Sequence, residues 1–193
     1  MNIAVFVSGN GTNLQSIIDS AKRGDIKGKI ALVISNNNDA YALTRAKQAG
    51  IETFILDHKG FGSREEYDTA ISKELEKRDI GLIALAGFMR LLSPHFVKKY
   101  KGKILNIHPS ILPDFKGTHG IKDAFEAGVA KTGVTVHFVD EELDHGPIVL
   151  QKEVKIDKKD TLKTLEEKIH KIEHEIYPKA IQLVIEGKAK IQQ

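Results

Sequence analysis

The tripeptide Asn106-Ile107-His108 places an amide and an imidazole two residues apart in an apolar stretch. The run from Ile104 predicts a short buried strand, and Pro109 cannot donate to a sheet ladder, so we expect the strand to end at His108. Because strand side chains alternate, Asn106 and His108 should point to the same face. An amide can donate to a developing oxyanion, and an imidazole can donate or accept a proton near neutral pH. A strand end that merely carries two polar residues is the equal alternative.

A second candidate site is the glycine-rich turn at residues 8–13, which follows the apolar run Ile3 to Val7. Apolar residues at helical spacing from Leu14 onward predict a helix directly after the turn. A strand, turn and helix in this order expose backbone N–H groups and the positive end of the helix dipole to an anion. The turn lacks the third glycine of a dinucleotide motif and the lysine of a P-loop, so a single phosphate monoester fits best. A purely structural turn is the alternative.

Two other polar patterns carry weaker signals. The acidic turn from Asp140 to Asp144 resembles many solvated turns, and His170-Lys171-Ile172-Glu173-His174 matches the H-x-x-E-H pattern of some zinc proteases. Few residues follow that pattern, and no other acid-bearing helix remains for a third ligand, so no metal is expected. The absence of cysteine excludes disulfides and thiolate metal sites.

The elements that position these residues alternate between strand and helix. This alternation predicts an α/β fold with a doubly wound, mostly parallel sheet, right-handed crossovers and helices on both faces. The carboxyl ends of such strands meet at one ligand-binding edge, where residues 8–13, 87–92 and 106–108 should all lie. Glycines at 117, 120 and 128 bracket a segment that we expect to move as a lid, residues 116–131. The expected strands are 1–7, 30–34, 53–56, 82–86, 104–108, 135–139 and 148–155; the expected helices start near 14, at 40 after an Asp39 cap, at the Ser63–Glu66 capping box, at 94, at 122 and at 160.

Composition sets broad limits on function. A length of 193 residues suggests one domain, and 29 basic against 26 acidic residues give a net charge of only +3, too balanced to indicate nucleic-acid binding. Neither a secretory leader nor a membrane-spanning run is visible. We therefore expect a soluble cytoplasmic protein with small-molecule partners, no nucleic acid and no membrane; the oligomeric state is open, and a homodimer is possible.

Taken together, residues 8–13, 106–113 and 144–147 resemble the phosphoribosylglycinamide formyltransferases, the folate-dependent enzymes of purine synthesis. The resemblance extends over essentially the whole chain, including residues 173–178. It implies a single domain with a seven-stranded sheet, a nucleotide-binding half of about residues 1–100 and a folate-binding half of about residues 101–193. It also implies formyl transfer from the co-substrate 10-formyltetrahydrofolate to a glycyl amine, by direct attack through a tetrahedral intermediate and without a metal.

The same resemblance implies the roles of individual residues. The catalytic residues would be Asn106, His108 and Asp144. The phosphoribosylglycinamide site would comprise Gly11, Thr12, Asn13, Leu14, Gln15, His170, Lys171, Ile172 and Glu173. The folate site would comprise Arg64, Met89, Arg90, Leu91, Leu92, Asn106, Asp140, Glu141, Glu142, Leu143 and Asp144.

Other enzymes share this Asn-His-Asp set and remain alternatives. Methionyl-tRNA formyltransferase carries a C-terminal RNA-binding domain, whereas this chain shows no basic extension before Gln193. Formyltetrahydrofolate hydrolase usually carries an N-terminal regulatory domain and has His-His where this chain has His108-Pro109. A catalytically inactive nucleotide-binding module is a third alternative, against which the intact set argues.

Overall fold

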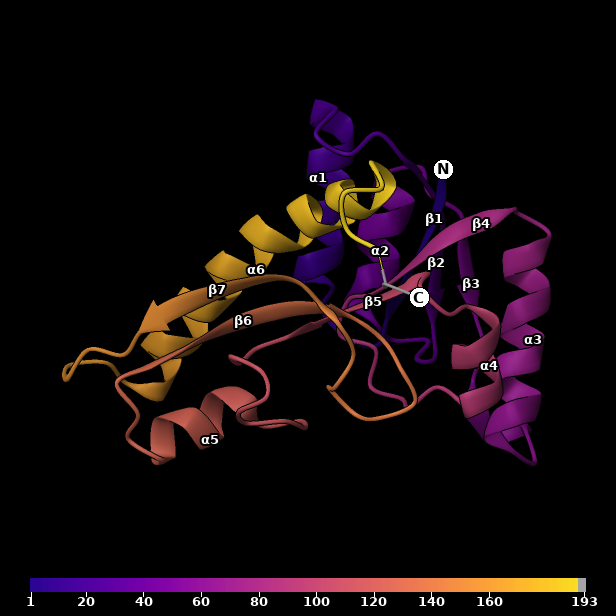
Figure 1. Ribbon diagram of the computed structural model, residues 1–193. Coiled ribbons are helices and arrows are strands. Elements are labelled where there is room, and N and C mark those ends of the chain that lie inside the picture. Colours follow the sequence, from indigo (N-terminus) through magenta and orange to yellow (C-terminus); the bar gives the residue numbers. More distant parts are fainter. Residues whose placement is uncertain (191–193) are drawn as a thin grey trace.

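A seven-stranded sheet flanked by helices on both faces organises the computed structural model, which describes residues 1–190 (Figure 1). The strand order is β3-β2-β1-β4-β5-β6-β7; β1 to β5 are parallel, and β6 and β7 run antiparallel to their neighbours. The predicted fold class is therefore confirmed. The strands are β1 (Asn2–Val7), β2 (Lys29–Ser35), β3 (Thr53–Ile55), β4 (Ile80–Leu85), β5 (Ile104–His108), β6 (Lys131–Phe138) and β7 (Ile148–Lys155). The helices are α1 (Thr12–Arg23), α2 (Tyr41–Gln48), α3 (Arg64–Glu76), α4 (Pro94–Lys99), α5 (Gly120–Glu126) and α6 (Leu162–Ile185), with a short 3₁₀ turn at His58–Gly60.

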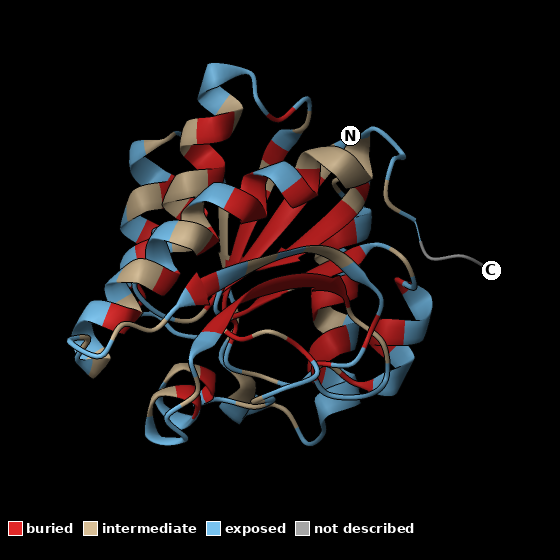
Figure 2. Ribbon diagram, turned by 60° about the vertical axis from the view of Figure 1, so that its left-hand side comes forward, coloured by how far each residue is buried: buried red, intermediate tan, exposed pale blue. Residues whose placement is uncertain are grey.

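The sheet separates two hydrophobic cores. Along β1, Ile3, Val5 and Val7 face the first core, which α1, α2 and α6 cover, while Ala4 and Phe6 face the second core under α3 and α4. This alternation explains the unbroken apolar sequence of β1, because a strand covered on both faces has no solvent side. Figure 2 shows the buried strands between helices that expose their outer faces. No helix within residues 1–190 has both the length and the apolar character to cross a bilayer.

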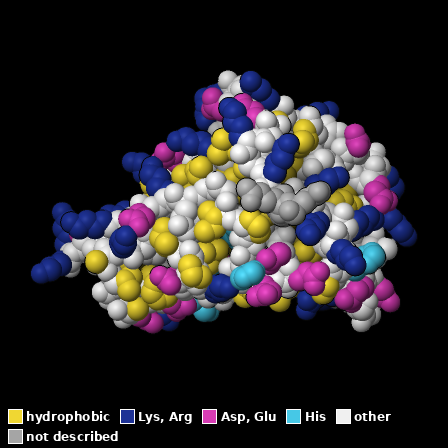
Figure 3. Space-filling model, viewed as in Figure 1, with side chains coloured by type: hydrophobic (Ala, Val, Ile, Leu, Met, Phe, Trp, Pro, Cys, Tyr) yellow, Lys and Arg dark blue, Asp and Glu magenta, His cyan; other side chains and the backbone are white. Residues whose placement is uncertain are grey.

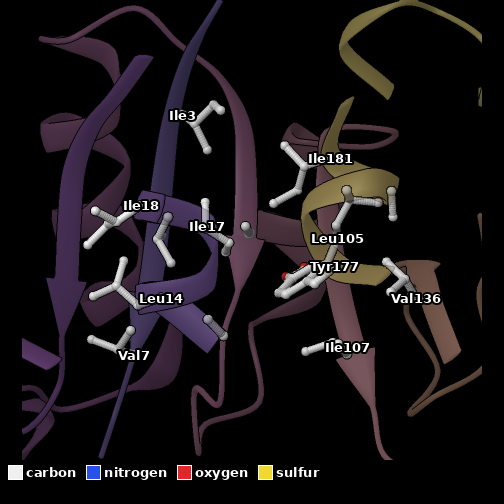
Figure 4. Close-up of a cluster of buried hydrophobic side chains, with 14 of the residues drawn as sticks. Ile3, Val7, Leu14, Ile17, Ile18, Leu105, Ile107, Val136, Tyr177 and Ile181 are labelled. Carbon is white, nitrogen blue, oxygen red and sulfur yellow. Dashed lines mark hydrogen bonds between the residues drawn. The ribbon is translucent and has the colours of Figure 1, made fainter. Parts of the chain in front are cut away.

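Helix α6 joins the two halves of the sheet. It continues through Pro178, and the buried Tyr177 packs among the side chains of the first core (Figure 4). The Tyr177 hydroxyl lies 2.8 Å from the carbonyl oxygen of Leu85 on β4 and 3.2 Å from that of Leu105 on β5. One side chain therefore ties the carboxyl end of β4 to β5, next to the catalytic candidates.

Several element boundaries differ from the sequence expectations. β6 begins at Lys131 rather than Thr135, because it pairs with β7 from Lys131 opposite Lys155 onward. α2 begins at Tyr41 with Ala40 at the cap, so the expected Asp39 cap was wrong. Elsewhere β5 ends at His108 as expected.

Candidate active site

The carboxyl end of β5 gathers Asn106, His108 and Asp144 into one cluster. His108 Nδ1 lies 3.4 Å from Asp144 Oδ2, and Asn106 Nδ2 donates to Asp144 Oδ1 at 3.4 Å. His108 and Asp144 are buried, whereas Asn106 is partly exposed. Asp144 reaches the strand end from the loop between β6 and β7, where its backbone takes a left-handed φ of 47°. A carboxylate in this position can balance a positive charge on the imidazole.

The segment after β5 closes over His108. His108 Nε2 lies 2.8 Å from the backbone oxygen of Phe115, and the Gly117 N–H donates to Asp144 Oδ2 at 2.9 Å. Both ring nitrogens of His108 therefore face oxygen acceptors, an arrangement that suits the doubly protonated imidazolium. A Cβ at Gly120 would approach His108 Nε2 to 3.3 Å, so this segment is seated closely on the catalytic candidates.

A second histidine, His137 on β6, joins the cluster and lies outside the predicted set. The antiparallel register pairs Asn106 with His137, which brings their side chains together on one face of the sheet. His137 Nδ1 donates to the backbone oxygen of Phe138 at 2.9 Å, which leaves Nε2 to accept from Asn106 Nδ2 at 3.2 Å. Burial lowers the pKa of His137, so the neutral form that holds the Asn106 amide is favoured. The sequence signal is one imidazole in an apolar run, and it becomes informative only once the antiparallel register is known.

The glycine-rich turn leads directly into α1. Gly11 is the N-cap residue, with φ 76° and ψ 32°, and no side chain caps the first-turn N–H groups. These groups and the helix dipole are open to an anion. Arg45, from α2, also borders the turn: its Nε and Nη2 atoms each donate to Asn10 at 2.9 Å. Arg45 lies outside the predicted set, because its contact depends on how α2 packs beside the turn.

Helix α6 brings a buried carboxylate to the same turn. Glu173 accepts from Asn13 Nδ2 at 3.3 Å and from His170 Nδ1 at 2.9 Å. The hydrogen bond to Glu173 raises the pKa of His170, whose side chain is half exposed. Asn13 Oδ1 is buried without a hydrogen-bond partner among the described residues, which marks an acceptor for a ligand donor. Of the other predicted residues on α6, Lys171 is exposed and Ile172 packs against the first core.

Three of the predicted folate residues are large apolar side chains that lie open to solvent, and we call these three the apolar rim. Met89, Leu91 and Leu143 are 70%, 56% and 53% exposed, unusually open for large apolar side chains. Leu92 packs against the second core, and the Arg90 guanidinium lies 4.7 Å from the centre of the Tyr67 ring. Arg64 is exposed at the start of α3.

Apart from the buried Asp144, the acidic turn presents its charges to solvent. Asp140 accepts from His145 Nδ1 at 2.8 Å and from the Glu142 N–H at 3.0 Å, while Glu141 and Glu142 are exposed. Figure 3 shows acidic side chains gathered with a histidine on this face of the molecule. Across residues 1–190, no three His, Cys, Asp or Glu side chains are grouped to hold a metal ion.

Comparison with known proteins relates this geometry to one family. Residues 1–181 match the formyl transferase family. The chain is 47% identical over 190 residues to the phosphoribosylglycinamide formyltransferase of Haemophilus influenzae, covering 98% of this chain and 90% of the relative. It is 49% identical to the trifunctional purine biosynthetic protein adenosine-3 of Gallus gallus, covering 99% of this chain but 19% of that much longer protein. The crystal structure of glycinamide ribonucleotide transformylase 1 from Symbiobacterium toebii superposes with a TM-score of 0.97 at 43% identity, covering 100% of this chain and 91% of that one.

Proposed function

The chain belongs to the formyl transferase family, and on that premise we propose that it transfers the formyl group of 10-formyltetrahydrofolate to the glycyl amine of phosphoribosylglycinamide. This would be a step of purine biosynthesis, in keeping with the activity named for the H. influenzae relative and the purine biosynthetic role named for the G. gallus relative. The observation that carries the proposal is the buried cluster of Asn106, His108 and Asp144 at the sheet edge that also bears the glycine-rich turn.

The reaction needs stabilisation of charge rather than a protein nucleophile. The amine nitrogen of phosphoribosylglycinamide forms a bond to the formyl carbon, and the formyl oxygen becomes an oxyanion. The bond from that carbon to N10 of the folate then breaks, and N10 leaves with a proton while the product amide loses one. Donors aimed at the oxyanion and a group that can supply a proton are therefore the two requirements.

Asn106 and His108 meet these requirements. The partly exposed Asn106 amide can turn one N–H from Asp144 to the oxyanion while His137 holds the other. His108 Nε2 can exchange the Phe115 carbonyl for the formyl oxygen and so donate to the charge as it develops. Asp144 would hold the imidazolium from the Nδ1 side. The segment carrying Phe115 must therefore shift before His108 can act.

The glycine-rich turn and α6 would bind phosphoribosylglycinamide. The N–H groups of residues 11–14, with the charge of Arg45 beside them, suit the phosphate, whereas the Gln15 N–H already donates to the Gly11 oxygen at 2.9 Å. Glu173 and the unpaired Asn13 Oδ1 offer acceptors to ribose hydroxyls or to the amine. His170 adds a hydrogen-bonding ring at the outer side of Glu173.

The apolar rim would bind the folate. Met89, Leu91 and Leu143 expose area that a flat ring system would cover, and the charges of Arg64 and Arg90 suit its carboxylates. The folate would supply the activated one-carbon unit.

A transfer assay tests the proposal. Purified protein is mixed with both substrates, and folate product is followed by absorbance while the formylated amine is measured separately. We expect equal amounts of both products, loss of turnover in His108→Asn and normal turnover in the exposed control His95→Asn. Formation of the folate product without formylation of the glycyl amine would indicate a formyltetrahydrofolate hydrolase instead. Formylation of methionyl-tRNA in place of the glycyl amine would indicate a methionyl-tRNA formyltransferase. Either result would overturn the proposal.

A further inference from the structure

The folate segment, residues 89–92, has an irregular backbone although it is proposed to shape a binding site. It connects the end of β4 to α4 and forms neither helix nor strand. Leu92 packs against the second core, but Met89 and Leu91 are largely exposed, so the packing of these two side chains does little to fix the segment. The position of this segment must therefore depend on contacts other than the packing of these two side chains.

The first end of the segment is tied to the glycine-rich turn that follows β1. The Met89 N–H donates to Ser8 Oγ at 2.8 Å, and the same hydroxyl donates to Asn36 Oδ1 at 2.6 Å. Ser8 therefore accepts from the folate segment and is itself oriented by the loop after β2. A hydroxyl can make both bonds at once, whereas alanine can make neither.

The second end of the segment is tied to α3. The N–H of Ser93, directly after the segment, donates to Asp68 Oδ2 at 2.6 Å. Asp68 is 2% exposed and Ser93 is fully buried. If the Asp68 carboxylate were removed, water could therefore not readily replace it as the acceptor of the Ser93 N–H. Burial raises the pKa of Asp68, while the hydrogen bonds from Ser93 and the charges of Arg90 and Arg64 oppose that rise. Burying a carboxylate costs free energy unless hydrogen bonds replace its contacts with water, and the Ser93 N–H supplies such a bond.

We infer that Ser8 and Asp68 are positioning residues that hold the two ends of the folate segment and thereby set folate affinity. Asp68 lies outside the predicted sites, and Ser8, although it opens the glycine-rich turn, precedes the predicted substrate residues 11–15 and uses its hydroxyl on Asn36 and Met89. Between these two contacts in the sequence, the Arg90 guanidinium lies over the Tyr67 ring, 4.7 Å from its centre. The inference rests on the proposed function for its folate readout, but the two ties themselves can be tested without activity.

Kinetics of four variants test the effect on binding. Ser8→Ala and Asp68→Ala should each raise KM for 10-formyltetrahydrofolate about tenfold, or about 1.4 kcal/mol, because each removes the acceptor of one backbone N–H, with KM for phosphoribosylglycinamide within about twofold. Asp68→Asn keeps an acceptor oxygen for the Ser93 N–H and should restore KM to within about threefold of wild type. Ser72→Ala is the matched control, because Ser72 is buried one turn further along α3. A merely structural role would instead lower the active fraction and leave both KM values unchanged.

Amide exchange provides a readout that does not depend on the proposed function. By ¹⁵N NMR, Ser8→Ala should speed exchange at the Met89 amide and Asp68→Ala at the Ser93 amide, each by about tenfold or more, with the other amide less affected. Faster exchange with unchanged folate KM would overturn the inference, as would equal rises in both KM values. If wild type shows no formyl transfer, the proposed function fails, and titration with tetrahydrofolate then decides the inference: equal affinity of wild type and both alanine variants overturns it.

Discussion

Asp144 contacts three groups at the proposed catalytic site at once: the Asn106 amide, the His108 ring and the Gly117 N–H. Asp144→Asn keeps the shape and removes the charge that faces the imidazole. We expect kcat to fall by about 10²–10³, as when a charge-stabilising group is lost, with both KM values within a few-fold. Steady-state kinetics would measure this, with the exposed Asp25→Asn as the control.

A double-mutant cycle tests whether Asp144 and His108 act as a unit. If they do, His108→Asn should damage turnover to a similar extent, and the double variant should be little worse than either single one. Fully additive losses would contradict the shared role.

His137 predicts a specific dependence of stability on pH. Burial lowers its folded pKa below the ordinary value near 6.5. The contribution of His137 to the free energy of unfolding is therefore complete above about pH 6.5. It is lost as pH falls through the folded pKa, by at most about 1.4 kcal/mol per pH unit. His137→Gln should flatten the decline of unfolding free energy between about pH 6.5 and 5, measured by urea denaturation.

His170 supplies a control of opposite sign for that experiment. The hydrogen bond to Glu173 raises the pKa of His170. The contribution of His170 to the free energy of unfolding is therefore complete below about pH 6.5 and is lost as pH rises through the folded pKa. His170→Gln should therefore lose its effect toward alkaline pH. The same direction of change in both variants would show that the assignment for His137 is wrong.

Single residues could be predicted from sequence where local spacing decides their direction. Asn106 and His108 share a face because they are two apart on a strand, and Pro109 marks the strand end. His137, Ser8 and Asp68 could not be found this way. Their contacts depend on the antiparallel register of β6, or on how β1 and α3 approach the segment after β4.

At the scale of elements, the junction of β1 and α1 links binding to backbone geometry. A Cβ at Gly11 would meet Ala42 Cβ at 2.5 Å, and φ is 76°. A valine there would thus displace α2 as well as obstruct the N–H groups. We expect even Gly11→Ala to weaken binding of phosphoribosylglycinamide at least about tenfold, with tetrahydrofolate affinity within about threefold, by calorimetric titration of each ligand.

Gly24→Ala is the matched control for Gly11→Ala. Gly24 ends the same helix with φ 83°, but a Cβ there meets nothing within 4 Å. Gly24→Ala therefore introduces the same backbone strain as Gly11→Ala, about 1 kcal/mol, but no steric contact. Equal loss of both ligand affinities in Gly11→Ala would indicate general destabilisation rather than a phosphate site.

The segment at residues 116–131 is predicted to become more ordered when folate binds. Its start is held by the Gly117 N–H on Asp144, and the preceding Phe115 carbonyl occupies His108 Nε2. If His108 acts as proposed, folate binding repositions this segment, and we expect its amide exchange to slow with tetrahydrofolate, measured by hydrogen–deuterium exchange. The loop at residues 156–161 is the control, and unchanged protection in 116–131 would rule out a folate-responsive lid.

The elements themselves were predictable to the extent that their signals are local. β7 has the predicted bounds, and Ser63 caps α3 by accepting from the Glu66 N–H. The Glu66 side chain departs from the capping box, because it accepts from Gly62 rather than from the cap residue. The longer β6 could not be predicted, since only its pairing with β7 extends the strand to Lys131.

For the whole molecule, Tyr177 predicts joint unfolding of the two proposed halves. Its buried hydroxyl serves both β4 and β5, so Tyr177→Phe leaves two carbonyl groups without this donor. We expect a loss of about 1–2 kcal/mol in unfolding free energy and still a single transition. Urea denaturation followed by circular dichroism and by tyrosine fluorescence would check this, with the exposed Tyr41→Phe as control. Separate midpoints for the two probes would mean that the halves unfold independently.

The bond between Asn13 and Glu173 also has a consequence for biosynthesis, because its two partners are 160 residues apart in the chain. At a translation rate of about 5–20 residues per second, the ribosome adds Glu173 about 8–32 s after Asn13. The glycine-rich turn can fold early with β1 and α1, but during this interval the Glu173 carboxylate that accepts from Asn13 has not yet been synthesised. A nascent chain would therefore carry the glycine-rich turn before the proposed substrate site is complete, and the proposed activity would appear only once α6 has docked.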